Sequence, residues 1–167
     1  MNNTLANVRL GLLLAILTVL FGIVLGVVFG VNEEGIVNWI AQGIAAHPEL
    51  HDASSPEKIW RYVQRAHMHA GGIGAFSLGL ILAVALSGMR APLKKLSSSL
   101  IGLSGFYPLS WFSTFYLSPS IGRDAAHHSA ISETLTYIGV GGLLLGLFIL
   151  IAHLLFDCWR EQPTMTG

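Results

Sequence analysis

The sequence predicts an all-α integral membrane protein: a four-helix bundle whose second and fourth helices extend beyond the bilayer on its outer side. Hydrophobic residues make up 53% of the 167 residues and charged residues 11%, whereas soluble domains carry about a quarter charged residues. Four apolar stretches also reach the roughly 20 residues that a helix needs to cross the hydrocarbon core. No internal repeat or second domain is visible, so we expect residues 1–167 to form one membrane domain.

The four predicted spans cover residues 10–31, 66–89, 96–117 and 135–156. No small-x-small cleavage site follows the first span before the acidic sequence NEEG, so we interpret this span as a retained anchor rather than a cleaved signal. The third span is the least uniform of the four because it contains six serines.

The outer segment, residues 32–65, is predicted to begin with a short interfacial helix. Asn32 can cap this helix, and two glutamates follow in the first turn, where they favour the positive end of the helix dipole. Isoleucines recur at every fourth residue from Ile36, so the helix has one apolar face and either lies along the interface or prolongs the first span. It should end near His47, because the proline that follows disfavours helix there.

Serine followed by proline at positions 55 and 56 signals the start of the second long helix. That helix can run unbroken to Met89, about 34 residues or roughly 51 Å at 1.5 Å per residue. The fourth helix can likewise start near Asp124 and run past Phe156. Both helices therefore exceed the membrane thickness, and we expect their extra turns on the outer side.

Four spans place both termini on one side of the membrane, and the charges indicate which side. Five Lys and Arg residues fall with the termini, and four fall on the other side together with seven of the nine acidic residues. The short APLKK turn adds a basic loop that resists translocation. We therefore expect a bacterial inner-membrane protein with both termini in the cytoplasm. The net charge of zero predicts no nucleic acid partner, and the single cysteine excludes an internal disulfide.

Small residues recur on one helix face, three or four positions apart, in three of the four spans, which favours close helix–helix contact in a membrane. The stripes are Gly22, Gly26 and Gly30 in the first span, Gly71, Ala75, Gly79 and Ala83 in the second, and Gly139, Gly142 and Gly146 in the fourth. We expect all three stripes to pack a compact bundle. The stripe of the second span starts one turn after His67, so it offers either a contact for another helix or room for a flat cofactor beside that histidine.

Six of the seven histidines fall on the predicted outer side: His47, His51, His67, His69, His127 and His128. Histidine is the commonest metal and haem-iron ligand, and ionisable side chains near membrane depth indicate functional sites. Side chains two residues apart on a regular helix differ by about 200°, so His67 and His69 cannot share one ion. His127 and His128 differ by about 100°, and His128 is the better inward candidate because it continues the glycine stripe of the fourth span through Ser132.

Three interpretations of these histidines remain open. In the first, His67 or His69 is an axial ligand of haem b, a histidine of the fourth span is the other, and two arginines hold the propionates by charge-assisted bonds. If the last charges of the two helices are aligned, His128 lies roughly 10 Å above His67, a separation that an edgewise haem between tilted helices can bridge. The residues of this candidate haem site are Arg61, Arg65, His67, His69, Gly71, Ala75, His127 and His128.

In the second interpretation, a copper or zinc ion binds at the outer interface, where a thioether from the sequence HMH suits Cu(I). The candidate metal ligands are His67, Met68, His69 and His128. In the third interpretation, the histidines are polar interfacial residues, and Glu133 pairs with Arg65.

The stretch RAHMHAGGIGAFSLGLIL, residues 65–82, resembles the ligand-bearing helices of small membrane haem-b proteins and of the haem–copper oxidase catalytic subunit. Those helices place a histidine near one end and follow it with small and aliphatic residues. The resemblance implies that His67 or His69 is an axial ligand, and it nominates His127 or His128 on the fourth span. The chain differs from the oxidase subunit because it lacks the many further spans and the copper-site histidine cluster.

The outer half of the third span has six aromatic residues around Pro108, where a kink is expected. These aromatic side chains form either an interfacial belt or the lining of a haem or quinone pocket on the histidine side.

We therefore expect a small cofactor-binding membrane protein, with haem b as the cofactor, that serves electron transfer or a respiratory complex. The alternative is a non-catalytic structural or assembly subunit, whose glycine stripes dock onto a larger membrane complex or onto further copies of the chain. A copper- or zinc-binding membrane protein is a further alternative. An enzyme in its own right is not expected, because the sequence has no nucleophile–base pair, phosphate loop or paired carboxylates.

Overall fold

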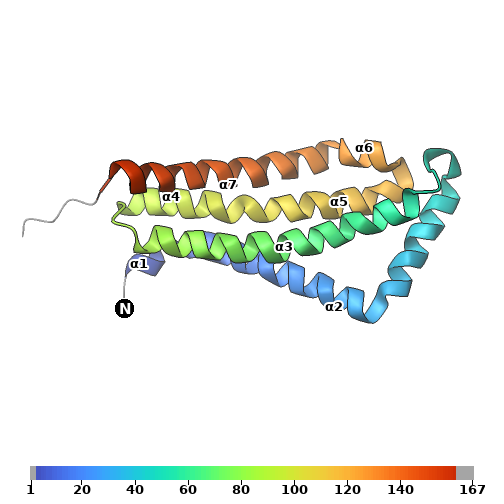
Figure 1. The fold of residues 1–167 in the computed structure, drawn as a ribbon, viewed down its shortest axis with the longest axis horizontal. Coiled ribbons are helices and arrows are strands. Elements are labelled where there is room, and N and C mark those ends of the chain that lie inside the picture. Colours follow the sequence, from blue (N-terminus) through green and yellow to red (C-terminus); the bar gives the residue numbers. More distant parts are fainter. Residues whose placement is uncertain (1–2, 161–167) are drawn as a thin grey trace, which may run out of the picture.

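A computed structural model describes residues 3–160, in which every regular element is a helix (Figure 1). The elements are α1 (Asn3–Ala6), α2 (Arg9–Ala46), η1 (Pro48–Leu50), α3 (Ser55–Leu86), α4 (Ala91–Gly102), η2 (Leu103–Gly105), α5 (Phe106–Ile121), α6 (Arg123–His127) and α7 (Ala130–Phe156). Three of them, α2, α3 and α7, are long and apolar enough to cross a membrane. The all-α class is thus confirmed.

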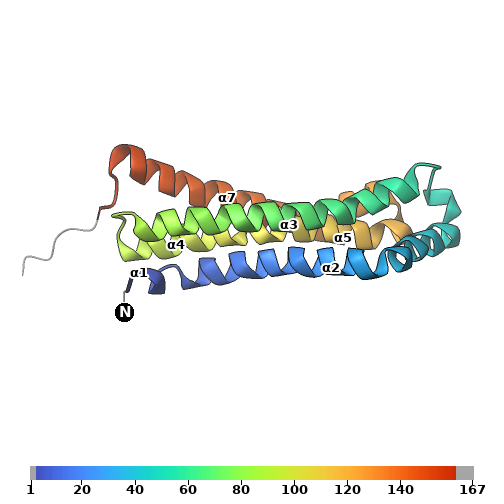
Figure 2. The ribbon, with the colours of Figure 1, turned by 60° about the horizontal axis from the view of Figure 1, so that its bottom comes forward.

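Helix α2 contains both the predicted first span and the predicted interfacial helix. The two parts meet at a kink at Asn32, whose backbone leaves the helical region with φ −147° and ψ 35°, and the chain turns there across the end of the molecule (Figures 1 and 2). Beyond the kink, Ile40 is buried and the isoleucines one turn before and after it pack on the same core. The helix ends at Ala46, as the following proline predicts.

Helix α3 begins where the serine–proline signal predicts and ends at Leu86, three residues before the predicted end. Its start is fixed by Asp52, whose carboxylate accepts hydrogen bonds from the Ser54 amide and hydroxyl and from the Ser55 hydroxyl. Its end coincides with Ser87, which is extended and donates its hydroxyl hydrogen to a carbonyl of the last turn.

The buried stripe of α3 differs from the predicted stripe. It consists of Ile59, Val63, Ala66, Ala70, Gly74, Ser77, Ile81, Val84 and Ala85. Gly71, Ala75 and Gly79 are exposed, and a Cβ atom on either glycine would meet nothing within 4 Å. The prediction that this second stripe packs the bundle is therefore wrong. In its middle part the buried stripe also consists of small residues about one helical turn apart (Ala66, Ala70, Gly74 and Ser77), so spacing alone does not distinguish the two stripes there.

The predicted third span is divided between two shorter helices, α4 with 12 residues and α5 with 16. The short 3-10 segment η2 joins them without a change of direction (Figure 1). This irregular turn lies just before Pro108, which has no N–H to donate to the carbonyl four residues back. The serines of this stretch serve packing: Ser97 donates to the Gly146 carbonyl of α7, and the Ser104 hydroxyl bonds that of Ser77 on α3.

The predicted fourth helix is interrupted. Residues Arg123–His127 form α6, and α7 starts after Ser129, whose backbone is extended (φ −64°, ψ 144°). The Ser129 side chain caps α7 by accepting a hydrogen bond from the Ser132 amide. His128 therefore lies off the stripe of α7 and is exposed, which corrects the prediction that it continues the stripe. The rest of that stripe is confirmed, because Gly139, Gly142 and Gly146 are all buried.

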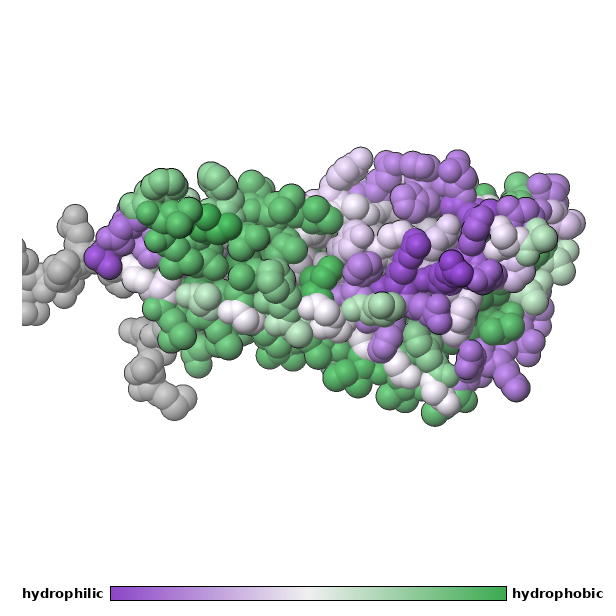
Figure 3. Space-filling view, in the orientation of Figure 1, coloured by the Kyte–Doolittle hydropathy of each residue, from purple (hydrophilic) through white to green (hydrophobic). Residues whose placement is uncertain are grey.

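Four rods lie alongside one another: α2, α3, the α4–α5 rod and α7 (Figures 1 and 2). The α4–α5 rod packs against each of the other three, whereas α3 packs mainly against α2 and this rod. The surface divides the molecule into an apolar half, which contains the start of α2 and the end of α7, and a polar half, which contains α6 and the start of α3 (Figure 3).

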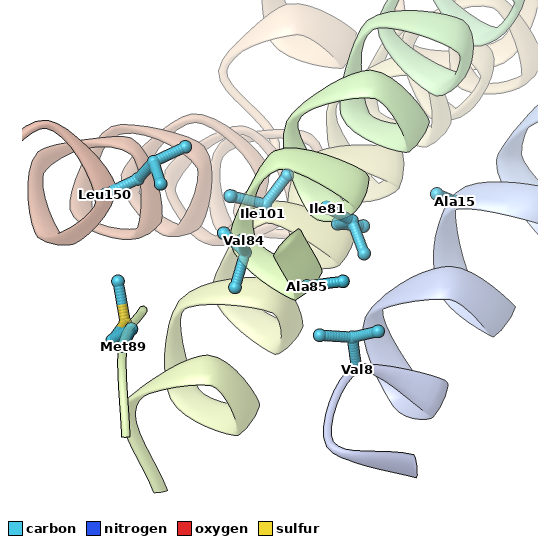
Figure 4. Packing of buried hydrophobic residues seen from close by; sticks show 8 residues of the cluster. All are labelled: Val8, Ala15, Ile81, Val84, Ala85, Met89, Ile101 and Leu150. Atoms are coloured by element: carbon cyan, nitrogen blue, oxygen red, sulfur yellow. The ribbon is translucent and has the colours of Figure 1, made fainter. Parts of the chain in front are cut away.

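Each half has its own hydrophobic core. In the apolar half, Val8, Met89 and Leu150 converge from three different parts of the chain (Figure 4). In the polar half, the cluster of Leu25, Ile40, Ile59, Val63, Ala66 and Phe115 is surrounded by aromatic side chains. The chain after α7 folds back on the α3–α4 turn, where the Arg90 amide donates to the Trp159 carbonyl.

Candidate functional site

Aromatic and ionisable side chains gather around Trp111 of α5 in the polar half. The Arg65 guanidinium of α3 lies 4.7 Å from the centroid of the Trp111 ring. The His69 ring stacks on the same tryptophan at 6.4 Å, and the His127 ring of α6 meets it edge-on at 5.7 Å. Tyr107, one turn earlier on α5, contacts His69 at 5.0 Å. Three helices thus contribute to one aromatic cluster.

A cavity of about 340 Å³ opens beside this cluster, between α5 and the first turns of α7. Its lining residues are Tyr107, Ser110, Trp111, Thr114, His127, His128, Ser132, Glu133, Thr136 and Tyr137. Aromatic rings and hydroxyl groups dominate this lining, and one carboxylate and two imidazoles stand at one end. A second cavity of about 270 Å³ shares both histidines and adds Tyr62, Arg123 and Asp124.

The hydroxyl groups of the cavity are largely bonded to each other or to their own helices. The Ser132 oxygen lies within hydrogen-bond distance of the hydroxyls of Ser113 (2.7 Å), Ser129 (3.0 Å) and Thr114 (3.3 Å). Thr136 donates to a carbonyl one turn back on α7. This network joins α5 to α7 and fixes the polar wall of the cavity.

Two groups on the residues that line the cavity can form further hydrogen bonds. The Trp111 Nε1 atom is buried and has no hydrogen-bond partner among the described residues, although an indole N–H is an obligate donor. Glu133 places one carboxylate oxygen 3.2 Å from His128 Nδ1. The predicted pairing of Glu133 with Arg65 is not found within residues 3–160, because these two side chains have the partners just described.

His67 occupies a different environment, on the side of α3 that faces α2. Its Nδ1 lies 2.8 Å from the Gly22 carbonyl oxygen, to which it donates. Its ring also meets Phe29 edge-on at 5.4 Å and fills the space above Gly26. The Nε2 atom has no hydrogen bond among the described residues and is not buried. The stripe of α2 is thus confirmed at its first two glycines, whereas Gly30 meets nothing within 4 Å.

The predicted haem-site residues are divided between two sides of α3. His67 and the open residues Gly71 and Ala75 share one side, while Arg65 and His69 contact the aromatic cluster on the other. The sixth of the α3 candidates, Arg61, forms an exposed ion pair with the glutamate one turn before it.

His127 of α6 packs on Trp111, and His128, directly after α6, packs on His127 at 5.2 Å. The structure therefore brings these two histidines toward His69 and not toward His67. Helices α3 and α7 hardly contact each other, because the α4–α5 rod lies between them. The predicted pair of His67 with a histidine of the fourth span is therefore not assembled within one chain.

The described part of the chain contains no group of three or more His, Cys, Asp or Glu side chains that could hold a metal ion. α3 is regular through the HMH sequence, so His67 and His69 point to different sides. Met68 between them is 70% exposed. The four candidate metal ligands, His67, Met68, His69 and His128, therefore do not point toward one common position.

The polar half is closed at its far end by the loop before α3. Arg123 of α6 donates to Asp52 at 2.8 Å, and His51 bonds the Pro119 carbonyl of α5 at 3.1 Å. The hydrogen bond from the Ser54 hydroxyl, further bonds from Ser54 and Ser55, and the charge of Arg123 lower the pKa of Asp52 to about 2. This loop therefore connects the start of α3 to α5 and α6.

Trp111 and Tyr107 belong to the aromatic group of the third span, for which a pocket lining was one of two interpretations, whereas Ser132 and Thr136 of α7 were not predicted as cavity residues. A signal for the α5 side of the cavity exists in the third span, where Tyr107, Trp111 and Thr114 recur at helical spacing and mix aromatic with hydroxyl side chains on one face. No protein-family model, no curated protein and no solved structure matches this chain.

Proposed function

We propose that this chain is an integral membrane protein with four spans, in which the continuous α4–α5 rod is the third. The apolar surface of one half supports this placement, as do the exposed apolar side chains of α2 and α7. Arg9, Arg90, Lys94 and Lys95 lie at the end of the molecule where α2 begins and α7 ends, which supports cytoplasmic termini in a bacterial inner membrane. The polar half then protrudes on the opposite side.

The function that we propose within this membrane protein is haem b binding for electron transfer, with His67 as the axial ligand. The observation that carries the proposal is the hydrogen bond from His67 Nδ1 to the Gly22 carbonyl. Iron-ligating and metal-ligating histidines commonly donate one ring N–H to a carbonyl, which fixes the tautomer and leaves the other nitrogen as the ligand. His67 Nε2 is the nitrogen left available here.

The residues beside His67 fit a flat group. Gly71 and Gly72 are exposed, and a side chain at either position would meet nothing within 4 Å. Ala75 continues this smooth face one turn further. When bound, haem supplies a one-electron redox centre; the chain's own contribution is to hold His67 against α2 in one orientation and to present small residues on the exposed part of the face next to it.

One chain offers one axial histidine on this face, because His69 and the histidines of α6 lie on the other side of α3. We therefore expect a five-coordinate, high-spin haem spectrum, or a six-coordinate spectrum only where a second molecule supplies the other ligand. The absorption spectrum of the purified protein, oxidised and then reduced with dithionite, measures this directly.

Substitutions distinguish the role of His67 as the iron ligand from the role of the neighbouring residues that leave room for haem. His67→Ala should remove the Soret band, whereas His69→Ala should keep it. Gly71→Leu should exclude haem without unfolding the protein, because it obstructs an open face, and Gly79→Leu two turns away is the matched control that should retain haem. A wild-type preparation without a Soret band, from a host that supplies haem, would refute the proposal.

A second function is favoured by the same face of α3. Gly71, Gly72, Ala75 and Gly79 form an exposed strip of small residues, and such strips let transmembrane helices approach closely. As a structural or assembly subunit, the chain would pack this strip against a larger membrane complex. In that case both Gly71→Leu and Gly79→Leu should abolish co-purification with the partner, and no haem should appear with any variant.

The membrane placement has an independent test. A reporter fused after Gly167 should lie in the cytoplasm, and one inserted at Ala53, in the exposed loop before α3, should lie outside. The reverse pattern would overturn the sidedness, and both reporters on one side with no membrane fraction would overturn the four-span placement.

A further inference from the structure

The cavity between α5 and α7 is a second candidate site, separate from His67 and on the other side of α3. We propose that it binds the ring of a quinone or quinol. The proposal depends on the membrane placement above but not on haem, because none of the cavity residues belongs to the His67 face.

The position of the cavity along α7 suits a molecule that is dissolved in the membrane. Glu133 and Ser132 stand at the start of the helix, while the exposed apolar residues Ile138, Val140 and Leu144 follow directly below the cavity. Tyr137, the lining residue furthest along α7, is 71% exposed. A ring can therefore enter from the membrane side while an isoprenoid tail remains along the lipid-facing surface of α7.

The shape and chemistry of the lining suit a substituted ring with oxygen atoms. The cavity volume of about 340 Å³ accommodates a single ring system. Trp111 and Tyr107 offer aromatic faces, which favour offset stacking with another ring. The wall of hydroxyl groups on the opposite side is polar yet internally bonded, so it tolerates ring substituents without demanding a charge.

The two unfilled bonding groups complement the two kinds of ring oxygen. Trp111 lines the cavity, and its Nε1, a buried donor without a partner among the described residues, can donate to an oxygen of either a quinone or a quinol once the indole turns toward the bound ring. A buried donor left unpaired destabilises the protein, so a ligand acceptor at that point is favoured. Glu133, held against His128, is an acceptor, which only the hydroxyl of a quinol can satisfy. We therefore expect the quinol to bind more tightly than the quinone.

The experiment is calorimetric titration of the full-length protein in lipid nanodiscs with decylubiquinone, decylubiquinol and a decyl menaquinone analogue. Binding should saturate at one molecule per chain. Trp111→Phe keeps the ring but removes the donor, so it should weaken every ligand by up to about tenfold, the equivalent of about 1.4 kcal/mol. Glu133→Ala should reduce quinol affinity to that of the quinone.

Two further variants test the cavity itself. Thr136→Phe fills the space from the α7 side and should abolish binding; it removes the Thr136 bond to the Ser132 carbonyl but leaves the bonds of the Ser132 hydroxyl in place. Thr134→Phe places the same side chain at an exposed position of α7 that does not line the cavity, and it should leave the affinity within about twofold of the wild type. Thermal unfolding of each variant verifies its folding.

Non-saturable uptake equal to that of empty nanodiscs would overturn the proposal, as would wild-type affinity in Thr136→Phe. Competition by excess phospholipid with the same cavity dependence would assign the cavity to a lipid instead. Loss of a Soret band in Thr136→Phe but not in His67→Ala would overturn both this proposal and the haem assignment to His67, whereas quinol binding without any Soret band would overturn only the latter.

Discussion

In the apolar half, helices touch backbone to backbone, whereas in the polar half they are held apart by rings. A Cβ on Gly142 would stand 2.9 Å from the Leu100 carbonyl, and one on Gly146 would stand 2.8 Å from the Ser97 carbonyl. At the other end, Phe29 packs on Trp60 at 5.4 Å, and Tyr62 packs on Trp111 at 5.8 Å. The same rods therefore use two different packing modes along their length.

This difference decides where a ligand can be accommodated. Close backbone contact leaves less space, where a cavity of about 170 Å³ beside Gly102 and Gly105 is found, but it gives helices in lipid the van der Waals contact that hydrophobic burial does not supply there. Aromatic side chains are large and rigid, so their packing leaves larger irregular spaces: the cavity of about 340 Å³ lies between α5 and α7, and the one of about 270 Å³ lies between α3 and α6. The apolar half thus holds the rods together, and the polar half provides the candidate site.

The strongest way to break this comparison is to add a side chain at a backbone contact of α7. Gly142→Leu should lower the free energy of unfolding by about 3 kcal/mol, at the upper end for overpacked sites, because its neighbours include backbone atoms that cannot move aside. Gly141→Leu is the matched control, since a Cβ there meets nothing within 4 Å. Chemical denaturation in detergent measures both. Equal effects would show that the stripe is not a packing surface.

The parts of the fold that follow from local chemistry could be predicted from the sequence. The serine–proline start of α3 and the end of α2 before Pro48 depend on backbone restrictions of proline, which act within a few residues. The glycine stripe of α7 could also be predicted, because Gly139, Gly142 and Gly146 share one face of that helix and most of the residues between them are large and apolar.

The parts of the fold that depend on a choice between two similar faces of one helix could not be predicted from the sequence. On α3, the stripe through Ala70 and Gly74 is buried and the stripe through Gly71 and Gly79 is exposed. In a membrane protein the outward face is apolar as well, so hydropathy does not separate them. The cavity around Trp111 arises only when α5 and α7 pair, and the break at Ser129 turns His128 away from the helix stripe. Both are tertiary features that spacing along one helix does not contain.

Buried hydroxyl pairs give a second test, with a smaller effect. Ser77→Ala removes the hydrogen-bond partner of Ser104, whose side chain is 1% exposed, and should reduce the free energy of unfolding by about 1–3 kcal/mol. The double variant with Ser104→Ala should recover much of that loss, because no polar group is then left unpaired. Ser113→Ala, at the polar half, should have less effect, since Ser132 retains the hydroxyls of Ser129 and Thr114. A double variant no more stable than Ser77→Ala alone would contradict this account.

The smallest expected effect concerns the loop that closes the polar half. Asp52→Asn weakens the bonds to Ser54 and Ser55 and removes the ion pair with Arg123. Because the hydrogen bond from Ser54 and its neighbours lower the pKa of Asp52 from 3.8 to about 2, the folded state favours the ionised carboxylate. The stabilisation is therefore complete above pH 3.8 and is lost as the pH falls through about 2.

The measurement is the difference in melting temperature between the wild type and Asp52→Asn at pH 6 and at pH 2. We expect a small difference at pH 6, since the carboxylate is exposed to solvent and its ion pair is screened, and a smaller one at pH 2. Glu33→Gln is the control: this exposed acid directly follows the kink of α2 at Asn32, and its replacement should show no such pH dependence. A difference that grows on acidification would mean that Asp52 is paired in the unfolded chain rather than in the folded one.

Because Asp52 connects α3 to α6 and not to the apolar half, Asp52→Asn should also speed proteolysis at Ala53 without changing cleavage near Arg160. The two ends of the molecule should therefore respond separately.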